Sequence, residues 1–126
     1  MEVVVNAEEV LVKCGNDIKL VHELCKLFVE ESARLMRALG DAVVNRDAGA
    51  MKRATHSLRG STQFFSSGPA VETLKQLEAI ACSGSLNEAD HAFSRLVQQM
   101  NEVREATARL PLEVDAAAMA DETTRT

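Results

Sequence analysis

An amphipathic stripe runs through residues 18–44 and predicts a long α-helix. Its apolar positions recur mostly at steps of three and four residues, the spacing that places side chains on one face of a helix. They are Ile18, Val21, Leu24, Cys25, Phe28, Leu35, Leu39 and Val43. The composition agrees, because the chain has no Trp or Tyr, has only two Pro, and is rich in Leu, Ala, Glu, Lys, Arg and Met. We therefore expect an all-α protein.

Turn residues divide the rest of the chain into further helical segments. A capping-box pattern opens a short segment over 7–14, and a second one at Ser85 is expected to open the last helix. Between these two segments, turn residues (Asn, Asp, Gly and Pro) mark the ends of two further helical segments, 47–65 and 69–83. Four amphipathic helices joined by short loops favour antiparallel neighbours. The predicted architecture is an antiparallel up-down-up-down four-helix bundle with a short N-terminal helix.

The amphipathic period is lost after Pro111, where small, acidic and Thr residues follow. We therefore expect residues 1–110 to form one helical bundle domain and residues 111–126 to form a frayed or disordered tail, part of which extends the last helix weakly.

Charge and cysteine content exclude several classes of protein. The net charge of −5 disfavours nucleic acid and anionic membranes as partners. The three cysteines, Cys14, Cys25 and Cys82, have no C-x-x-C spacing, which indicates neither a disulfide framework nor a thiolate zinc site. No apolar run approaches the roughly 20 residues of a membrane span, and the N-terminus lacks the basic start of a secretory signal. We expect a cytoplasmic protein in a reducing compartment.

The stretch ATHSLRGSTQFF, residues 54–65, places a histidine on the solvent side of a predicted helix. The core stripe of this helix is expected to be Met51, Ala54, Leu58, Thr62 and Phe65. At about 100° per residue, His56 lies roughly 160° from the middle of that stripe. The residues on the His56 side are Lys52, Arg59, Gly60, Gln63 and Ser67.

Gly60 is an unusual choice at this place, because glycine costs roughly 1 kcal/mol against alanine inside a helix. It lies one turn beyond His56, so the missing side chain clears space above the imidazole for another molecule. The guanidinium of Arg59 suits an anion such as phosphate, and Lys52 adds to the same positive field, which favours the neutral, nucleophilic imidazole. These features predict a phosphoryl acceptor.

The string HSLRGST resembles the signature of histidine-containing phosphotransfer (HPt) domains. The upstream string CGNDIKLVHELCKLFVEE and the downstream string LKQLEAIACSG resemble further parts of that family, so the resemblance covers about residues 7–108. It implies that His56 is phosphorylated, that Arg59 lies beside the phosphoryl group and that Gly60 lets a receiver domain approach. Glu78 matches a position where family members place a polar residue that orients the imidazole, in some of them an amide.

The resemblance implies a phosphoryl carrier and not an enzyme. His56 is expected to accept a phosphoryl group from an aspartyl phosphate on the receiver domain of a hybrid sensor kinase and to pass it to the receiver of a response regulator. Gln63 and Lys52 are expected to support the site, and Phe64 and Ser67 to contact the partner, unless Phe64 fills a groove beside the segment 69–83. No bound cofactor or metal is expected, because the Mg²⁺ comes with the receiver. We expect a monomer.

Two other functions remain open on sequence grounds. One is an adaptor bundle that binds a receiver without being phosphorylated. The other is a metal-binding helical bundle, because Glu88 and His91 form a Glu-x-x-His step of the kind used in di-iron proteins. His22 lies among core-facing residues and is expected to be a partly buried, hydrogen-bonded histidine.

Overall fold

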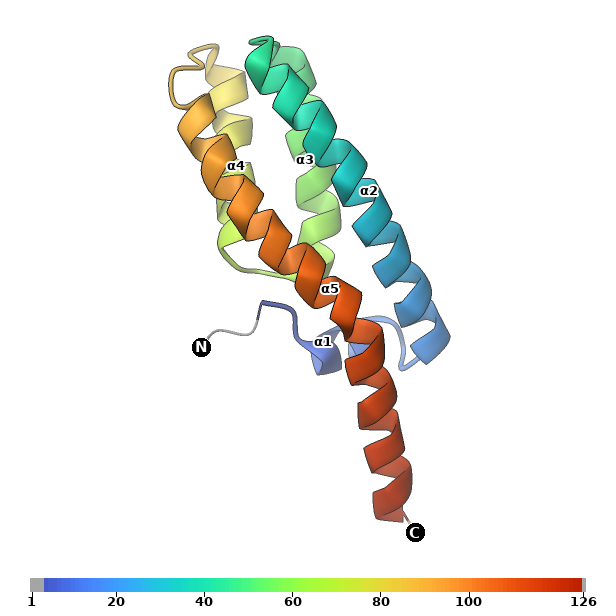
Figure 1. The fold of residues 1–126 in the computed structure, drawn as a ribbon. Helices are drawn as coiled ribbons and strands as arrows, with labels where there is room; N and C mark the ends of the chain where they lie inside the picture. The colour runs from blue at the N-terminus through green and yellow to red at the C-terminus, as the bar shows by residue number, and fades with distance from the viewer. Residues whose placement is uncertain (1–3, 126) are drawn as a thin grey trace.

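The computed structural model describes the backbone of residues 4–125 and the side chains of residues 4–120. Over this range it contains five helices, and the prediction of an all-α protein is confirmed (Figure 1). They are α1 (Ala7–Lys13), α2 (Ile18–Val44), α3 (Ala48–Phe65), α4 (Pro69–Ser83) and α5 (Ala89–Arg125). None of the helices in the described part of the chain has the length and hydropathy needed to cross a bilayer.

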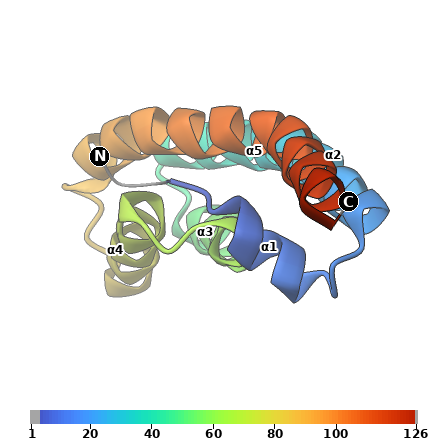
Figure 2. The same ribbon diagram turned by 90° about the horizontal axis from the view of Figure 1, so that it is seen from below.

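The four longer helices pack in a ring. α2 contacts α3 and α5, while α4 contacts the same two helices from the other side. Figure 1 shows α2 and α5 in front of α3 and α4, and Figure 2 shows the two pairs from below with α1 lying across one end. The seam between α2 and α5 therefore faces away from the seam between α3 and α4.

Polar side chains fix where the helices begin. The side-chain oxygens of Asn6, Asp17 and Asp47 each accept a hydrogen bond from the backbone N–H three residues later, at 3.0 to 3.1 Å. Each satisfies one of the backbone donors that a helix leaves unpaired at its start. α4 begins with Pro69, whose missing N–H costs nothing at this position, and is followed by Gly84 with a φ of +76°.

The start of α5 differs from the prediction. The helix begins at Ala89 and not after Ser85, because the backbone N–H of Ser85 donates to Ser83 Oγ at 3.2 Å and holds the loop after α4. The capping-box prediction at Ser85 is therefore wrong, since the first helical residue, Ala89, comes four residues later and Ser85 cannot cap it.

The core is built from the predicted stripes. All five expected core residues of α3 are buried, and the buried positions of α4 include Val71, Leu74, Leu77 and Ala81. On α2, Ile18 and Leu24 lie at the edge of the core, whereas the polar Ser32 is only 1% exposed. Its hydroxyl accepts a hydrogen bond from Arg104 Nε of α5 at 3.0 Å, which makes a buried polar position acceptable.

The expected tail after residue 110 is wrong over the described residues, because α5 continues through Pro111 to Arg125. Proline removes one backbone hydrogen bond and bends a helix without always ending it, and the ribbon changes direction towards its red end (Figure 1). Leu110 and Val114 are fully buried, and His22 Nε2 lies 2.9 Å from Asp115 Oδ1. This contact also confirms that His22 is a partly buried, hydrogen-bonded histidine.

Truncation after Leu110 is therefore expected to destabilise the protein. Loss of the buried Val114 side chain alone removes about 1.5–3 kcal/mol from the free energy of unfolding. Urea denaturation of the chain ending at residue 110, compared with the full chain, measures this loss. Equal unfolding midpoints for the two proteins would show that the end of α5 does not contribute to the fold.

The three free cysteines are expected to react with alkylating reagents at very different rates. Cys14 and Cys25 are buried and Cys82 is exposed. Burial raises the pKa of the Cys25 thiol to about 11, and burial together with the charge of Asp17 raises the pKa of Cys14. Since the thiolate is the reactive form, Cys25 is a reactive thiolate in only about one protein molecule in a thousand at pH 8. Mass spectrometry after iodoacetamide treatment should find one label, on Cys82, in the folded protein and three after denaturation.

Candidate functional site

His56 lies on the outer side of α3, where the seam between α3 and α4 is open to solvent. Its side chain is 72% exposed. The neighbouring Thr55 and Leu58 are fully buried, and Thr55 Oγ1 donates to the backbone carbonyl of Met51 at 2.8 Å. The core face of α3 therefore anchors the helix and turns the imidazole outward, as the helical phase predicted.

Glu78 of α4 is the residue that faces His56 across this seam. Its Oε1 lies 3.6 Å from His56 Nδ1, and its Oε2 lies 3.1 Å from Arg59 Nη1. The Glu78 side chain is only 19% exposed and Arg59 is 30% exposed, so this ion pair is partly shielded from water. The carboxylate thus connects the histidine and the arginine that the sequence placed on one face of α3.

The contacts of Glu78 leave it incompletely paired. Oε2 is buried and accepts no hydrogen bond of good geometry, although the Arg59 guanidinium is close enough for a strong charge interaction. Oε1 is just beyond hydrogen-bond length from the imidazole. A negative charge on the Nδ1 side of the ring favours the tautomer that carries its proton on Nδ1, and Nε2 lies on the other edge of the ring.

Gly60 has no packing reason to be a glycine. A Cβ atom built on it would meet no atom of the chain within 4 Å, and the residue is exposed within α3. Its cost to the helix therefore has no compensation inside the protein. The empty volume lies one helical turn from His56, where a partner backbone has room to approach.

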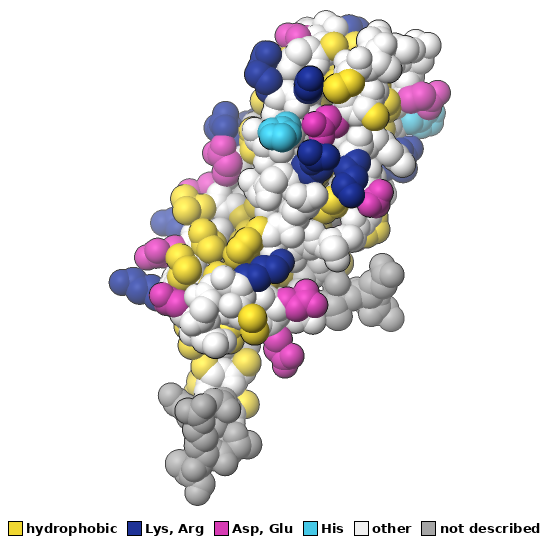
Figure 3. Space-filling view, turned by 180° about the vertical axis from the view of Figure 1, so that it is seen from behind, with side chains coloured by type: hydrophobic (Ala, Val, Ile, Leu, Met, Phe, Trp, Pro, Cys, Tyr) yellow, Lys and Arg dark blue, Asp and Glu magenta, His cyan; other side chains and the backbone are white. Residues whose placement is uncertain are grey.

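The other predicted site residues lie around this centre. Lys52, Gln63 and Ser67 are all exposed, Lys52 and Gln63 on α3 and Ser67 in the loop between α3 and α4. Figure 3, which views the molecule from behind, shows a histidine beside an acidic side chain, with several Lys and Arg side chains around them and a patch of hydrophobic side chains farther down.

Phe64 does not fill a groove beside α4. It lies at the end of α3 under α1, where Lys13 Nζ donates to its backbone carbonyl at 2.8 Å and lies 5.4 Å from its ring centre. The ring makes an edge contact with Phe65 at 5.0 Å between centres. Phe64 therefore belongs to the surface formed by α1, α2 and α3.

This surface contains an apolar cavity of about 290 Å³ between α2 and α3, which we call the α2/α3 pocket. Its lining residues are Leu24, Leu27, Phe28, Glu31, Ser61, Phe64 and Phe65. Leu27 is 59% exposed and adds apolar surface to the pocket. Leu27 and Ser61 were not predicted as pocket residues; for Leu27 the available signal was an apolar residue lying off the buried stripe of α2.

The metal-binding alternative finds no support in the described residues. Glu88 and His91 are both exposed near the start of α5, and no group of three or more His, Cys, Asp or Glu side chains in this part of the chain is arranged to hold a metal ion. A di-metal centre requires several carboxylates and histidines facing one another inside a bundle, so the residues present do not fit one.

Comparison with known proteins decides the family. The Hpt domain family model matches residues 23–106, a range that includes His56, Arg59, Gly60 and Glu78. The chain belongs to the Hpt domain family. An Hpt domain acts in histidine phosphotransfer within a phosphorelay, as a phosphocarrier and not as a kinase, and it interacts with receiver domains. Histidine phosphotransfer within a phosphorelay is therefore the function of this chain.

The fold of this Hpt domain is similar to a solved one. The crystal structure of histidine-containing phosphotransfer protein B (HptB) from Pseudomonas aeruginosa PAO1 superposes with a TM-score of 0.80. The match covers 90% of this chain and 98% of that chain, at 19% sequence identity. No curated protein matches the chain in sequence. The family match ends before the last turns of α5, which are therefore described by the structure alone.

Proposed function

We propose that His56 is the phosphoryl acceptor of this Hpt domain and that Nε2 is the nitrogen that forms the bond. The observation that carries the proposal is the contact between Glu78 and Nδ1 of an imidazole that is otherwise open to solvent. The antiparallel up-down-up-down bundle is part of the proposal, and the ring of contacts between helices adjacent in sequence supports it.

The transfer is a displacement at phosphorus. The lone pair of Nε2 attacks the phosphorus of an aspartyl phosphate, the N–P bond forms, and the P–O bond to the aspartate breaks, which leaves a carboxylate on the receiver. The Nδ1 proton stays on the ring and faces Glu78, so the positive charge that develops on the imidazole is stabilised by the carboxylate. Donation to a second receiver is the reverse of this step.

Arg59 and Lys52 supply positive charge beside the reacting nitrogen. The phosphoryl oxygens carry negative charge throughout the transfer, and a guanidinium is suited to bind them. The Mg²⁺ that such a transfer needs is proposed to come with the receiver. His56, Arg59 and Gly60 are the residues that act directly, with Glu78, Gln63 and Lys52 in support.

The receiver is proposed to dock over the α2/α3 pocket and the Gly60 face together. Leu27 and Phe64 provide an apolar centre, and Gln63, Ser67 and Lys13 provide a polar rim, the usual arrangement of a transient interface. Receivers of a hybrid sensor kinase and of a response regulator would use the same surface in turn. A cytoplasmic monomer is the form we propose for the carrier.

The test is transfer from a phosphorylated receiver. The protein is incubated with receiver domains charged by acetyl phosphate in the presence of Mg²⁺, and the product is examined for an acid-labile, base-stable phosphoryl group. Fragmentation mass spectrometry should place it on His56, and phosphorus–nitrogen NMR should assign it to Nε2. Docking of receivers without any label on His56 would favour the adaptor function instead.

Glu78 is expected to control the tautomer of His56. Glu78→Gln keeps an oxygen that can face Nδ1–H and removes the charge, whereas Glu78→Ala removes both the charge and the facing oxygen. We expect phosphoryl uptake to slow about tenfold in Glu78→Gln and more in Glu78→Ala, which corresponds to loss of about 1.4 kcal/mol of charge stabilisation in the transition state. Nitrogen-15 chemical shifts of the His56 ring measure the tautomer independently of activity. Unchanged shifts in Glu78→Ala would contradict the assignment.

A further inference from the structure

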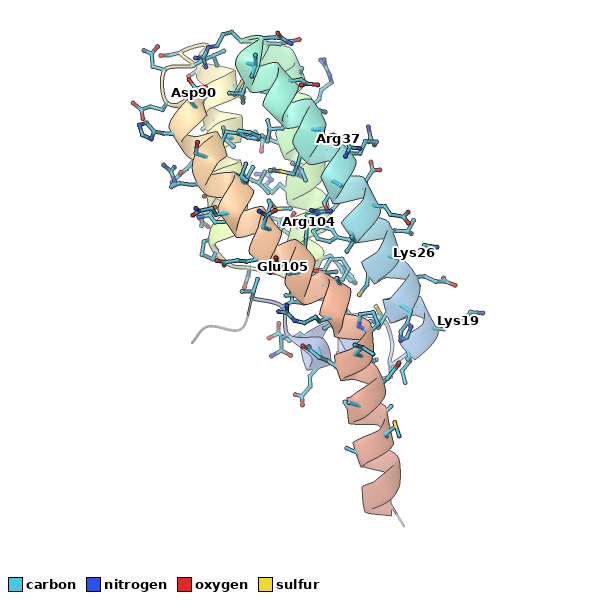
Figure 4. The ribbon with its side chains drawn as sticks, viewed as in Figure 1. Lys19, Lys26, Arg37, Asp90, Arg104 and Glu105 are labelled. Carbon is cyan, nitrogen blue, oxygen red and sulfur yellow. The ribbon has the colours of Figure 1, made fainter. Side chains whose placement is uncertain are left out.

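A second groove lies between α2 and α5, on the side of the ring opposite His56. It has a volume of about 310 Å³ and is lined by Ala33, Met36, Arg37, Phe93, Val97, Met100, Asn101 and Arg104. Figure 4 shows Arg37 on α2 and Arg104 on α5 on this face. We call it the α2/α5 groove. It is separate from the α2/α3 pocket, with which it shares no lining residue.

Packing between the two helices gives the groove fixed ends. At one end the Phe93 ring lies against Gly40, where an added Cβ would come within 3.2 Å of Phe93 Cζ. At the other end Arg104 crosses to α2, where Nε donates to Ser32 Oγ at 3.0 Å and Nη2 donates to the carbonyl of Val29 at 3.1 Å. The groove is therefore held open by both helices.

The charges of the groove are unbalanced. Arg37 and Arg104 are its only charged lining residues, and neither takes part in an ion pair with the other described residues. Arg104 is half-buried, and a guanidinium removed from water is stabilised by a counter-charge. Although the whole chain carries a net charge of −5, no acidic side chain lines the groove.

Between these cations the surface is apolar and adaptable. Met36 and Phe93 are half-buried, Met100 forms part of the floor, and Val97 is 37% exposed. Methionine side chains adjust to partners of different shape, and a groove between two helices accepts the ridge of a third. An occupant that fits must bring both aliphatic side chains and carboxylates.

We propose that the α2/α5 groove binds an acidic amphipathic helix of a partner protein. Its aliphatic residues pack over Met36, Phe93 and Val97, and its carboxylates pair with Arg37 and Arg104. Because the groove faces away from His56, this partner binds while a receiver occupies the phosphotransfer face. The surface would hold the carrier near a signalling partner without interrupting transfer. Binding in this groove does not depend on which residue of the chain is phosphorylated.

The test uses a synthetic helical peptide of about five turns, with Leu along one face and Glu on both flanks. A matched peptide carries Lys in place of Glu. Titration into the nitrogen-15-labelled protein is followed by NMR. We expect the Glu peptide to shift the amide signals of Met36, Val97 and Met100 and not those of His56 and Gly60, and the Lys peptide to bind at least about tenfold more weakly.

Two variants with the same change of charge locate the site. Arg37→Glu is expected to weaken Glu-peptide binding about tenfold, whereas Lys19→Glu, on α2 outside the groove, is expected to leave it unchanged. Absence of binding, equal binding of the two peptides, or shifts centred on the α2/α3 pocket would overturn the proposal. Signals of the groove that depend on protein concentration alone would also overturn it, since the occupant would then be a second copy of the chain.

Discussion

Replacing His56 with glutamine is expected to reduce phosphoryl uptake by at least about a hundredfold, to the background of the assay. Glutamine has no nitrogen that can form the phosphoramidate, and the other groups of the site cannot replace it. The fold should be unaffected, because the side chain is 72% exposed and the facing Glu78 carboxylate is 3.6 Å away, beyond hydrogen-bond length. Transfer assays with a charged receiver and thermal denaturation of the same samples measure the two expectations together.

The remaining histidines provide matched controls for this variant. His22→Gln and His91→Gln should accept phosphate at the rate of the unaltered protein, since His22 pairs with Asp115 and His91 lies exposed near the start of α5. Receiver binding by His56→Gln, followed by surface plasmon resonance, should persist. Label of normal intensity on His56→Gln would refute the assignment of the acceptor.

Substitution of Gly60 by leucine is expected to separate stability from function. Leucine favours a helix over glycine by somewhat less than 1 kcal/mol, and the Cβ position is free of contacts, so the free energy of unfolding should rise by about 0.5–1 kcal/mol. Transfer should fall, because the new side chain fills the volume that the receiver backbone needs. Overpacking of an interface by a side chain costs about 1–3 kcal/mol, which corresponds to a 5- to 150-fold slower transfer.

A substitution on another helix distinguishes this steric effect from a general effect of stabilisation. Ser94→Ala on α5 improves helix propensity at an exposed position outside the predicted site. It should raise stability slightly and leave transfer unchanged. Denaturant titration and receiver-transfer rates, measured on both variants, give the comparison. Normal transfer by Gly60→Leu would show that the receiver does not need the space left by the missing side chain of Gly60.

Local periodicity predicted most of the fold because each long helix carries its own pattern. Met51, Leu58 and Phe65 of α3 are buried as predicted. The spacing of residues along the helix was enough to predict that His56 lies on the opposite, exposed side. The same reasoning grouped Arg59 and Gly60 with His56, whereas their roles in transfer stay predictions. The contact with Glu78 depends on how α4 packs against α3, so no pattern within one helix gives its distances.

The errors also have identifiable causes. The stripe of α5 continues through Val103, Thr107, Leu110 and Val114, all at most 2% exposed, but Pro111 was taken as the end of the regular pattern. The exposed Leu27 was not predicted, because the apolar stripe shows which side of α2 faces the core. It does not show how much of that helix the neighbouring helices cover. Both features are decided by contacts between helices, which lie beyond a single-helix pattern.

The position of Arg59 has a consequence for how the two states of the carrier differ. In the unphosphorylated protein its guanidinium lies 3.1 Å from the Glu78 carboxylate. On the proposed acceptor, His56, a phosphoryl group would add about two negative charges beside the same guanidinium. Arg59 then has two competing anions, and a shift towards the phosphate releases Glu78 to interact with the imidazole alone. The phosphorylated and unphosphorylated carriers would thus differ in the charges on their docking surface. This difference gives a receiver a physical basis for distinguishing a carrier that can donate a phosphoryl group from one that can accept it.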